Sequence, residues 1–460
     1  MALDLVDIQG LAFYAYSEHP FAAYLHVHLA QHDPRTGAWV REMARHVRRA
    51  HNATDRGFRD RQRETVHVAF TCAGLQALGL THQELLAFPR EFVHGMNHGL
   101  RAKVLGDTPA KWTFGGPEQP QIHAVVLLYA RTRDERDELV QAHAGRIEAA
   151  GARVVHRDDA HILPQTHEHF GFHDGISEPH IGDGPRTKDV GPEASLAPGE
   201  LLVGQIDEYG QTNPAPVLRG FDVGSNGTFV VYRKLEQRVH AFWRAMRERA
   251  RPRPHETPEQ ASVRLAASLV GRWPGGAPIV DHPDKDPGIE TSTNDFLYAE
   301  KDPHGTRCPV GAHARRAYPR DMLPPAQQDS LTETSRHRLF RRGRPYGPPV
   351  GKPPWTLNVG DRDDDADGKR GLVFIALCGS LRRQFEFIQQ SWVLSPKFAG
   401  LHDERDPMIG GGGRFTVQRD PVRRCLVDLP SFVEMRGGAY FFMPGLRALE
   451  WLGSLDAPVR

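Results

Sequence analysis

The segment 121–163 constrains the fold more than any other part of the sequence. It holds an apolar β-rich run, IHAVVLLYAR, then a charged helical stretch, DERDELVQAHAGRIEAAG, and then a second β-rich run, ARVVHRDDAHIL. This change of hydrophobic period predicts a strand, a helix and a strand. Upstream, DIQGLAFYAY and TVHVAFTC predict strands, with a helix between them from about residue 20 to about residue 50. The first 165 residues therefore predict a βαββαβ order.

A comparable pattern returns in the second half of the chain. The stretch 182–199 is rich in Gly, Pro and charge, which is typical of a linker or a long surface loop. After it, GTFVVYRK, GLVFIAL and GGAYFFMP predict strands, and LEQRVHAFWRAMRERA and LRRQFEFIQQSW predict helices. We therefore predict an α+β protein with domains at 1–181 and 200–460.

The composition excludes some partners and compartments. Lys plus Arg is 58 and Asp plus Glu is 57, a net charge of +1, which disfavours nucleic acid and anionic membranes as partners. The four cysteines form no CxxC motif, so neither a zinc ribbon nor covalent cofactor attachment is indicated. Asp4 and Asp7 stand where a secretory signal carries positive charge, so a cytoplasmic location is expected.

One acidic stretch imitates a calcium-binding loop. DRDDDADG places Asp363, Asp365, Asp367 and Gly368 at the spacing of such a loop, but Phe374 occupies the position of the closing Glu. A solvated acidic loop is the preferred interpretation.

The first candidate site is THEHFGFHDGISEPH, residues 166–180. His167 and His169 are two residues apart, so in a strand both would point to one face and could bind a metal ion. Asp174 and Glu178 could complete such a metal site. Asp174 followed by a glycine is also a common turn. The residues alone leave a metal site, a catalytic acid and a plain turn open.

The second candidate site is CPVGAHARRAYPRD, residues 308–321. His313 could supply the single imidazole that a haem iron needs, and Arg315, Arg316 and Arg320 could neutralise haem propionates. Taken alone, this stretch is better interpreted as a basic loop with a solvated histidine.

Together with a third segment, RLFRRGRPYGPP, these two stretches resemble the dye-decolorizing peroxidase family. The GxxDG motif with Asp174 matches the first family element, GAHARRAYPR matches the haem-ligand segment, and FRRGRPYG matches the distal-arginine segment. QFEFIQQSW and the initial DIQG also resemble family segments, so the likeness covers nearly the whole chain. Ala314 and Tyr318 depart from the expected Ile and Asn, and His173 lies beside Asp174, which puts fine tuning of the site in doubt.

This resemblance implies two ferredoxin-like antiparallel-sheet sandwiches, with one non-covalent haem b bound in the C-terminal half. His313 would be the axial ligand, Asp174 the distal acid-base group and Arg341, rather than Arg342, the distal cation. The implied activity is oxidation of dyes, phenols or other small aromatic reductants by hydrogen peroxide, through a high-valent oxo-iron intermediate.

Further roles follow from the resemblance and from residue chemistry. We expect Glu386 to bind the second ring nitrogen of His313, with Asp321 as the runner-up, and Arg315 to lie near the haem. Leu372 and Phe374 lie two apart in an apparent strand, so they could line the distal pocket or equally pack in the core.

Electrons from bulky dyes could enter through surface aromatic residues, for which Tyr346 and Trp392 are candidates. Two alternative functions stay open at this point. One is a haem-handling protein of the deferrochelatase type, which releases iron with little turnover. The other is a non-haem metal enzyme built on His167, His169 and Asp174.

Overall fold

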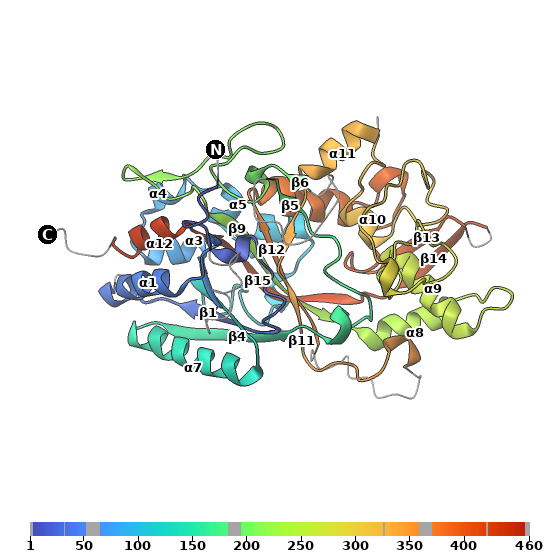
Figure 1. Ribbon diagram of the computed structural model, residues 1–460, viewed down its shortest axis with the longest axis horizontal. Helices are drawn as coiled ribbons and strands as arrows, with labels where there is room; N and C mark the ends of the chain where they lie inside the picture. The colour runs from blue at the N-terminus through green and yellow to red at the C-terminus, as the bar shows by residue number, and fades with distance from the viewer. Residues whose placement is uncertain are drawn as a thin grey trace.

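An antiparallel sheet of nine strands runs through the middle of the molecule (Figure 1). The structure is a computed structural model that describes residues 3–31, 33–51, 65–182, 195–324, 327–357, 370–419 and 422–455. The strand order is β10-β12-β9-β15-β2-β3-β1-β4, and β11 also pairs with β12. The sheet contains strands from both halves of the sequence, and helices pack around it.

The first half of the chain forms one ferredoxin-like unit. Its strands lie in the order β4-β1-β3-β2 and all pair antiparallel, as the βαββαβ pattern predicts. Two helices, α1 and α7, follow the first and third strands. The elements of this half are β1 (Phe21–His28), α1 (Pro34–His46), β2 (Thr65–Phe70), α3 (Cys72–Ala77), α4 (His82–Leu85), α5 (Arg90–His94), α6 (Gly99–Leu105), β3 (Ala124–Ala130), α7 (Arg133–Ala149), β4 (Arg153–His161) and β5 (His180–Ile181).

The second half repeats this order as β15-β9-β12-β10 and joins the first through the pair Phe442 and Phe70. The predicted helix at 381–392 consists of two π-helical segments, Arg382–Glu386 and Ile388–Val393. The remaining elements are β6 (Ser195–Leu196), β7 (Val217–Leu218), β8 (Phe221–Asp222), β9 (Thr228–Gln237), α8 (Val239–Arg249), α9 (Pro258–Val270), α10 (His313–Ala317), α11 (Gln327–Ser335), β10 (Phe340–Arg341), β11 (Arg344–Tyr346), β12 (Gly371–Cys378), β13 (Gly413–Val417), β14 (Arg424–Leu429), β15 (Val433–Met443) and α12 (Leu446–Leu452).

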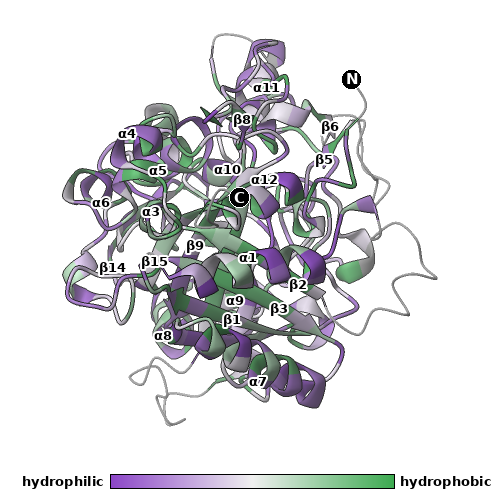
Figure 2. Cartoon of the chain, turned by 90° about the vertical axis from the view of Figure 1, so that its left-hand side faces the viewer, coloured by the Kyte–Doolittle hydropathy of each residue, from purple (hydrophilic) through white to green (hydrophobic). Residues whose placement is uncertain are grey.

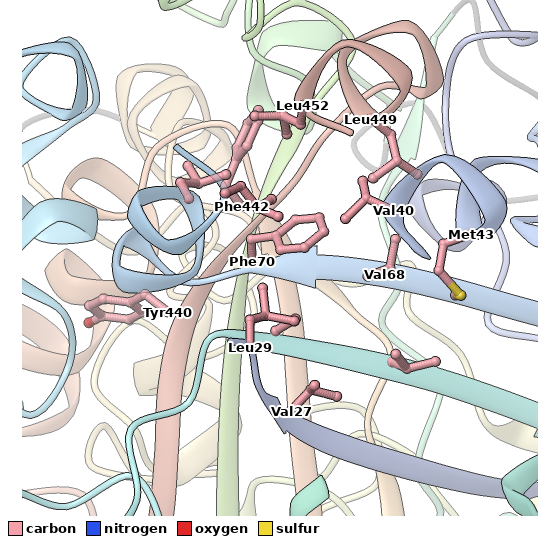
Figure 3. Close-up of a cluster of buried hydrophobic side chains, with 14 of the residues drawn as sticks. Val27, Leu29, Val40, Met43, Val68, Phe70, Tyr440, Phe442, Leu449 and Leu452 are labelled. Atoms are coloured by element: carbon pink, nitrogen blue, oxygen red, sulfur yellow. The ribbon is translucent and has the colours of Figure 1, made fainter. Parts of the chain in front are cut away.

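Both faces of the sheet are buried. In β2, for example, Val68 and Phe70 belong to one hydrophobic cluster and Ala69 to another on the opposite face. Figure 3 shows the first cluster, in which Val40 of α1 and Leu449 of α12 pack near the junction of β2 and β15. The strands are accordingly hydrophobic throughout, whereas the outer surfaces of α1 and α7 are polar (Figure 2).

The sequence prediction fails at strand β1. The predicted helix from about 20 to 50 begins as this strand, whose central residues are all buried, so it lacks the alternation typical of a half-exposed strand. Unlike the equally buried β2 and β3, β1 holds only one β-branched residue, Val27. The helix starts only at Pro34, after Asp33 caps it by accepting from the Arg35 N–H. The predicted strand DIQGLAFYAY is instead a short 3-10 turn, Gly10–Ala12.

Two predictions lie outside the described residues. The acidic loop with Asp363, Asp365, Asp367 and Gly368 falls there entirely, and so does 183–194 of the predicted linker. The division into two domains stays a prediction, since the hydrophobic clusters contain residues from both halves. None of the helices among the described residues is long and apolar enough to cross a membrane.

Candidate functional site

A rigid turn at the end of the first half positions Asp174. The side chains of Phe170 and Phe172 are buried against α8, where Trp243 donates its indole N–H to the Phe170 carbonyl at 3.0 Å. The carboxylate of Glu168 accepts from the backbone N–H groups of Phe170 and Phe172, at 2.9 and 3.0 Å. These contacts fix the backbone on which Asp174 sits.

Gly171 is required by this turn. Its φ of +93° lies in the left-handed region, and a Cβ atom added there would come 3.0 Å from the Trp355 ring. The glycine of the GxxDG motif therefore has a packing role beside the carboxylate.

Asp174 forms an ion pair with Arg341. Arg341 Nη1 donates to Asp174 Oδ1 at 3.0 Å, and the Gly175 N–H donates to the same oxygen at 2.7 Å. Burial alone would raise the pKa of Asp174, but Arg341 and the Gly175 N–H outweigh it and hold the pKa below its ordinary value. Asp174 is therefore an ionised carboxylate near neutral pH.

Glu178 is a second carboxylate on the same arginine. Its oxygens lie 3.3 Å from Arg341 Nε and 3.3 Å from Arg342 Nη1. Burial raises the pKa of Glu178 despite both arginines. The sequence suggested Glu178 only as a metal ligand, whereas the structure places it as an anchor for both cations.

The two neighbouring arginines have different surroundings. Arg342 is buried, and its guanidinium donates to the carbonyls of Leu11 and Ala12 at 2.8 Å each. The side chain of Arg341 keeps 35% of its surface accessible beside Asp174. Arg342 thus stabilises the N-terminal turn at Leu11 and Ala12 through hydrogen bonds, and Arg341 is the cation of the site.

His313 begins α10 and is held by Asp406. His313 Nδ1 lies 2.9 Å from Asp406 Oδ2, and the other carboxylate oxygen accepts from the Met408 and Ile409 N–H groups at 2.9 Å. Burial alone would lower the pKa of His313, but Asp406 raises it. With Nδ1 bound to Asp406, Nε2 is the nitrogen that remains to bind a metal ion.

Asp406 takes the role that the sequence analysis gave to Glu386, and this is a correction. The Glu386 carboxylate accepts instead from Arg101 Nη1 at 2.6 Å and from the Tyr440 hydroxyl at 3.0 Å. The runner-up, Asp321, accepts from backbone N–H groups, including that of Tyr298 at 2.7 Å. Asp406 is 93 residues from His313 in the chain, and no local motif links the two.

The two ion pairs face a common space. His313, Asp174 and Arg341 lie deep in the molecule, yet their side chains keep 33%, 40% and 35% of their surface accessible. Arg341 and Asp174 both act electrostatically on His313. The three side chains therefore interact and border one accessible space, the hollow, which carries an imidazole, a carboxylate and a guanidinium.

Leu372 and Phe374 lie on the same sheet face as Arg341. Arg341 is opposite Ala376 in the ladder between β10 and β12, and residues two and four positions before Ala376 point the same way. Both side chains are half-buried. This placement agrees with the predicted pocket lining, although Phe374 also packs against the core.

The arginines of the His313 segment do not reach this space. Arg315 is fully buried, donates to Asp302 Oδ2 at 3.0 Å and stacks on Tyr298. Arg316 and Arg320 are also buried and donate to backbone carbonyls. The predicted contact of Arg315 with a cofactor is therefore not formed, because the three side chains anchor α10 instead.

Other candidates separate in space. His167 Nε2 bonds to the Pro274 carbonyl at 3.2 Å and His169 Nε2 to the Tyr346 carbonyl at 2.8 Å. Within the described ranges, no group of three or more His, Cys, Asp or Glu side chains could hold a metal ion. The side chains of Tyr346 and Trp392 are buried, so neither is at the surface.

Known proteins resemble the chain over most of its length. It is 30% identical over 406 residues to a dye-decolorizing peroxidase of Mycetinis scorodonius, covering 84% of this chain and 75% of the relative. A multifunctional dye peroxidase of Amycolatopsis is 30% identical over 416 residues, covering 84% and 81%. No protein-family model matches the chain.

Solved structures agree over the whole fold. An ancestral D-type dye-decolorizing peroxidase has a TM-score of 0.78 at 27% identity, covering 98% of this chain and 99% of that one. A fungal DyP-type peroxidase from Auricularia auricula-judae has a TM-score of 0.80 at 25% identity, covering 99% and 100%.

Proposed function

This chain belongs to the dye-decolorizing peroxidase family, and from that premise we propose that His313, Asp174 and Arg341 carry its peroxidase reaction. The family implies a haem cofactor, hydrogen peroxide as oxidant and dyes or other reductants as electron donors. The observation that supports these roles is the pair of Asp174 with Arg341 facing the pair of His313 with Asp406.

The residues of the site fit one non-covalent haem b per chain. His313 offers Nε2 to the hollow, and the charged pair borders the same space. The four cysteines are free, and Cys308 and Cys378 are fully buried, which supports non-covalent binding. When bound, the haem iron supplies the redox chemistry with peroxide that no protein side chain here provides.

Asp174 is the proposed proton carrier. Because its pKa is lowered, the carboxylate would be free to take a proton from one oxygen of hydrogen peroxide and to deliver it to the other. The oxygen that receives the proton would then be able to leave as water. A single group on one side of the peroxide suffices for both transfers.

Arg341 is the proposed stabilising cation. Its guanidinium remains charged, because the neighbouring carboxylates of Asp174 and Glu178 raise its pKa even though burial opposes this. It is positioned to stabilise negative charge on the outer oxygen as that oxygen departs. Glu178 keeps the guanidinium directed toward Asp174.

Asp406 orients His313 and increases the electron density of its ring. The carboxylate has no accessible surface and is itself held by two backbone N–H groups, so the imidazole is fixed in one orientation. This partner would make His313 Nε2 a strong electron donor to a bound iron.

An absorption spectrum of the purified protein with a steady-state assay tests the proposal. An intense Soret band and peroxide-dependent oxidation of a dye or phenol are expected. His313→Ala should give protein without stable haem, because the protein-to-iron bond is lost. Full haem content and an unchanged axial-imidazole spectrum in this variant would show that His313 is not the ligand. Iron release from haem without peroxidase turnover would instead favour the haem-handling alternative.

A further inference from the structure

A second cavity, of about 1030 Å³, lies on the same face of the sheet as Arg341. Phe374 and Leu235 line it, and they lie opposite Arg233 and Leu372 in the ladder between β12 and β9. Its lining does not include His313, Asp174 or Arg341. The cavity is therefore distinct from the hollow that these three residues border.

The lining of this cavity is basic. It contains five basic side chains but only two acidic ones, in a chain whose net charge is +1. Both acidic groups are neutralised, Asp107 by Arg233 at 2.7 Å and Glu434 by Arg436 at 3.1 Å. The remaining basic side chains are Lys103, Lys111 and Arg405.

These three cations are available to a ligand. Lys103, Lys111 and Arg405 are exposed, and none of their side chains forms an ion pair or hydrogen bond with another residue that the structure describes. A concave site with one sign of charge concentrates ligands of the opposite sign. The cavity thus favours an anion.

Part of the remaining lining is apolar and suits an aromatic body. The apolar residues come from four different parts of the chain and are Leu105, Leu235, Phe374, Phe385, Leu394 and Met435. We propose that this cavity binds an anionic aromatic reductant, of the class of sulfonated dyes and aromatic carboxylates, as an electron donor for the peroxidase reaction. The proposal rests on the proposed function.

The position of the cavity supports electron transfer to the haem site. Arg405 and Ile409 line it, and between them in the sequence lies Asp406, the partner of His313. On the other side, Phe374 shares a sheet face with Arg341. The cavity is therefore lined by residues that adjoin Asp406 in the sequence and by a strand that also pairs with the strand of Arg341.

The stoichiometry closes with two donor molecules per cycle. Each donor gives up one electron and becomes a radical, and hydrogen peroxide accepts two electrons and two protons to form two water molecules. Peroxide is the oxidant that the family activity already supplies, so no further co-reactant is needed.

The test is charge reversal in the holoenzyme. Lys103→Glu combined with Lys111→Glu should weaken binding of a sulfonated azo dye to the resting enzyme about tenfold, measured by calorimetry without peroxide. The KM for this dye should rise by a similar factor, and raising the ionic strength should weaken binding to the unmodified protein. Lys285→Glu, an exposed lysine outside the lining, is the matched control and should change neither value.

Three controls separate the possible causes. The double variant should oxidise a neutral methoxyphenol at the rate of the unmodified protein. If the unmodified protein itself did not oxidise this phenol, the result would contradict the proposed function rather than this site. Unchanged dye affinity in the double variant would overturn the site. Loss of haem from the double variant would also overturn it, because the cations would then be holding the carboxylates of the cofactor.

Discussion

At the scale of single residues, the sequence motifs contain the side chains that the structure brings together, but they do not identify the second partners of these side chains. Asp174 and Arg341 belong to short motifs, and the structure joins them at 3.0 Å although they are 167 residues apart. Asp406 and Glu178 act on His313 and Arg341 through contacts that only the folded chain creates. A carboxylate far away in the sequence leaves no local pattern that identifies its partner.

Replacing each of the two adjacent arginines should separate catalysis from stability. Arg341→Leu should keep the haem and slow the reaction with peroxide ~100-fold or more, because it removes charge stabilisation of the leaving oxygen. Arg342→Leu should instead destabilise the fold, because two buried carbonyls, those of Leu11 and Ala12, lose their donor. Stopped-flow rates and urea unfolding measure the two effects, and the reverse assignment would mean that Arg342 is the distal cation.

The lowered pKa of Asp174 predicts activity in acid. A carboxylate with a depressed pKa stays ionised until the pH falls through that value, so the base should be lost only below the ordinary value of 3.8. The steps that reduce the oxidised enzyme consume protons, so their rate rises as the pH falls. We therefore expect dye oxidation to keep increasing down to about pH 4 and to decline only below it.

Rates for wild type and Asp174→Asn between pH 3 and 8 check this prediction. The Asn variant should react with peroxide ~100-fold more slowly or worse at every pH. An optimum near neutrality, or an Asn variant as fast as wild type, would remove Asp174 from this role.

Glu178 offers a third test at this scale. Glu178→Gln keeps an oxygen acceptor for Arg341 and should retain most of the peroxide reactivity, whereas Glu178→Ala should lose about tenfold as the guanidinium is released. Because the pKa of Glu178 is raised and that of Asp174 is lowered, Glu178 is already protonated at the pH where Asp174 titrates. The Gln variant should therefore keep the acid limb of the unmodified protein, and a shifted limb would show that Glu178 is charged there.

At the scale of elements, the buried strands β2 and β3 were predicted and the buried strand β1 was not. The pattern of β3, α7 and β4 appears within two residues of its predicted bounds. β1 holds one β-branched residue, Val27, so its sequence resembles a buried helix more than those of β2 and β3 do. The three arginines beside His313 were expected at a ligand, but the short helix α10 needs them as anchors.

The anchoring of α10 predicts a large stability effect. Asp302→Asn should lower the free energy of unfolding by about 3–5 kcal/mol, because it leaves the buried charge of Arg315 without its carboxylate. Chemical unfolding followed by circular dichroism measures it. Asp403→Asn is the matched control, since the pair of Asp403 with Arg414 is exposed and should contribute nothing measurable. Equal effects in both variants would contradict the assigned role of the buried pair.

At the scale of the whole molecule, the sequence indicated two αβ units, but it did not indicate that their strands join in one sheet. Four predicted strands in the first half and three in the second indicate two αβ units, which the family resemblance identifies as ferredoxin-like. Nothing in either pattern shows that β15 would pair with β2. The junction rests on α1 and α12, which pack together over it (Figure 3).

Shared packing predicts that the halves unfold together. Residues of both halves contribute to the two hydrophobic clusters, so thermal unfolding of the haem-free protein should show a single transition. Near-ultraviolet and far-ultraviolet circular dichroism should give the same midpoint. Two separated transitions would show that 1–181 and 200–460 are independent domains.

The pairing of Asp174 with Arg341 also bears on the order of events during synthesis. The first half leaves the ribosome and begins to fold before the second half has been translated. Asp174 then exists without its arginine until a further 167 residues have been added. A nascent or truncated chain that ends before Arg341 cannot assemble the peroxide side of the site, so reactive chemistry is postponed until translation of both halves is nearly complete.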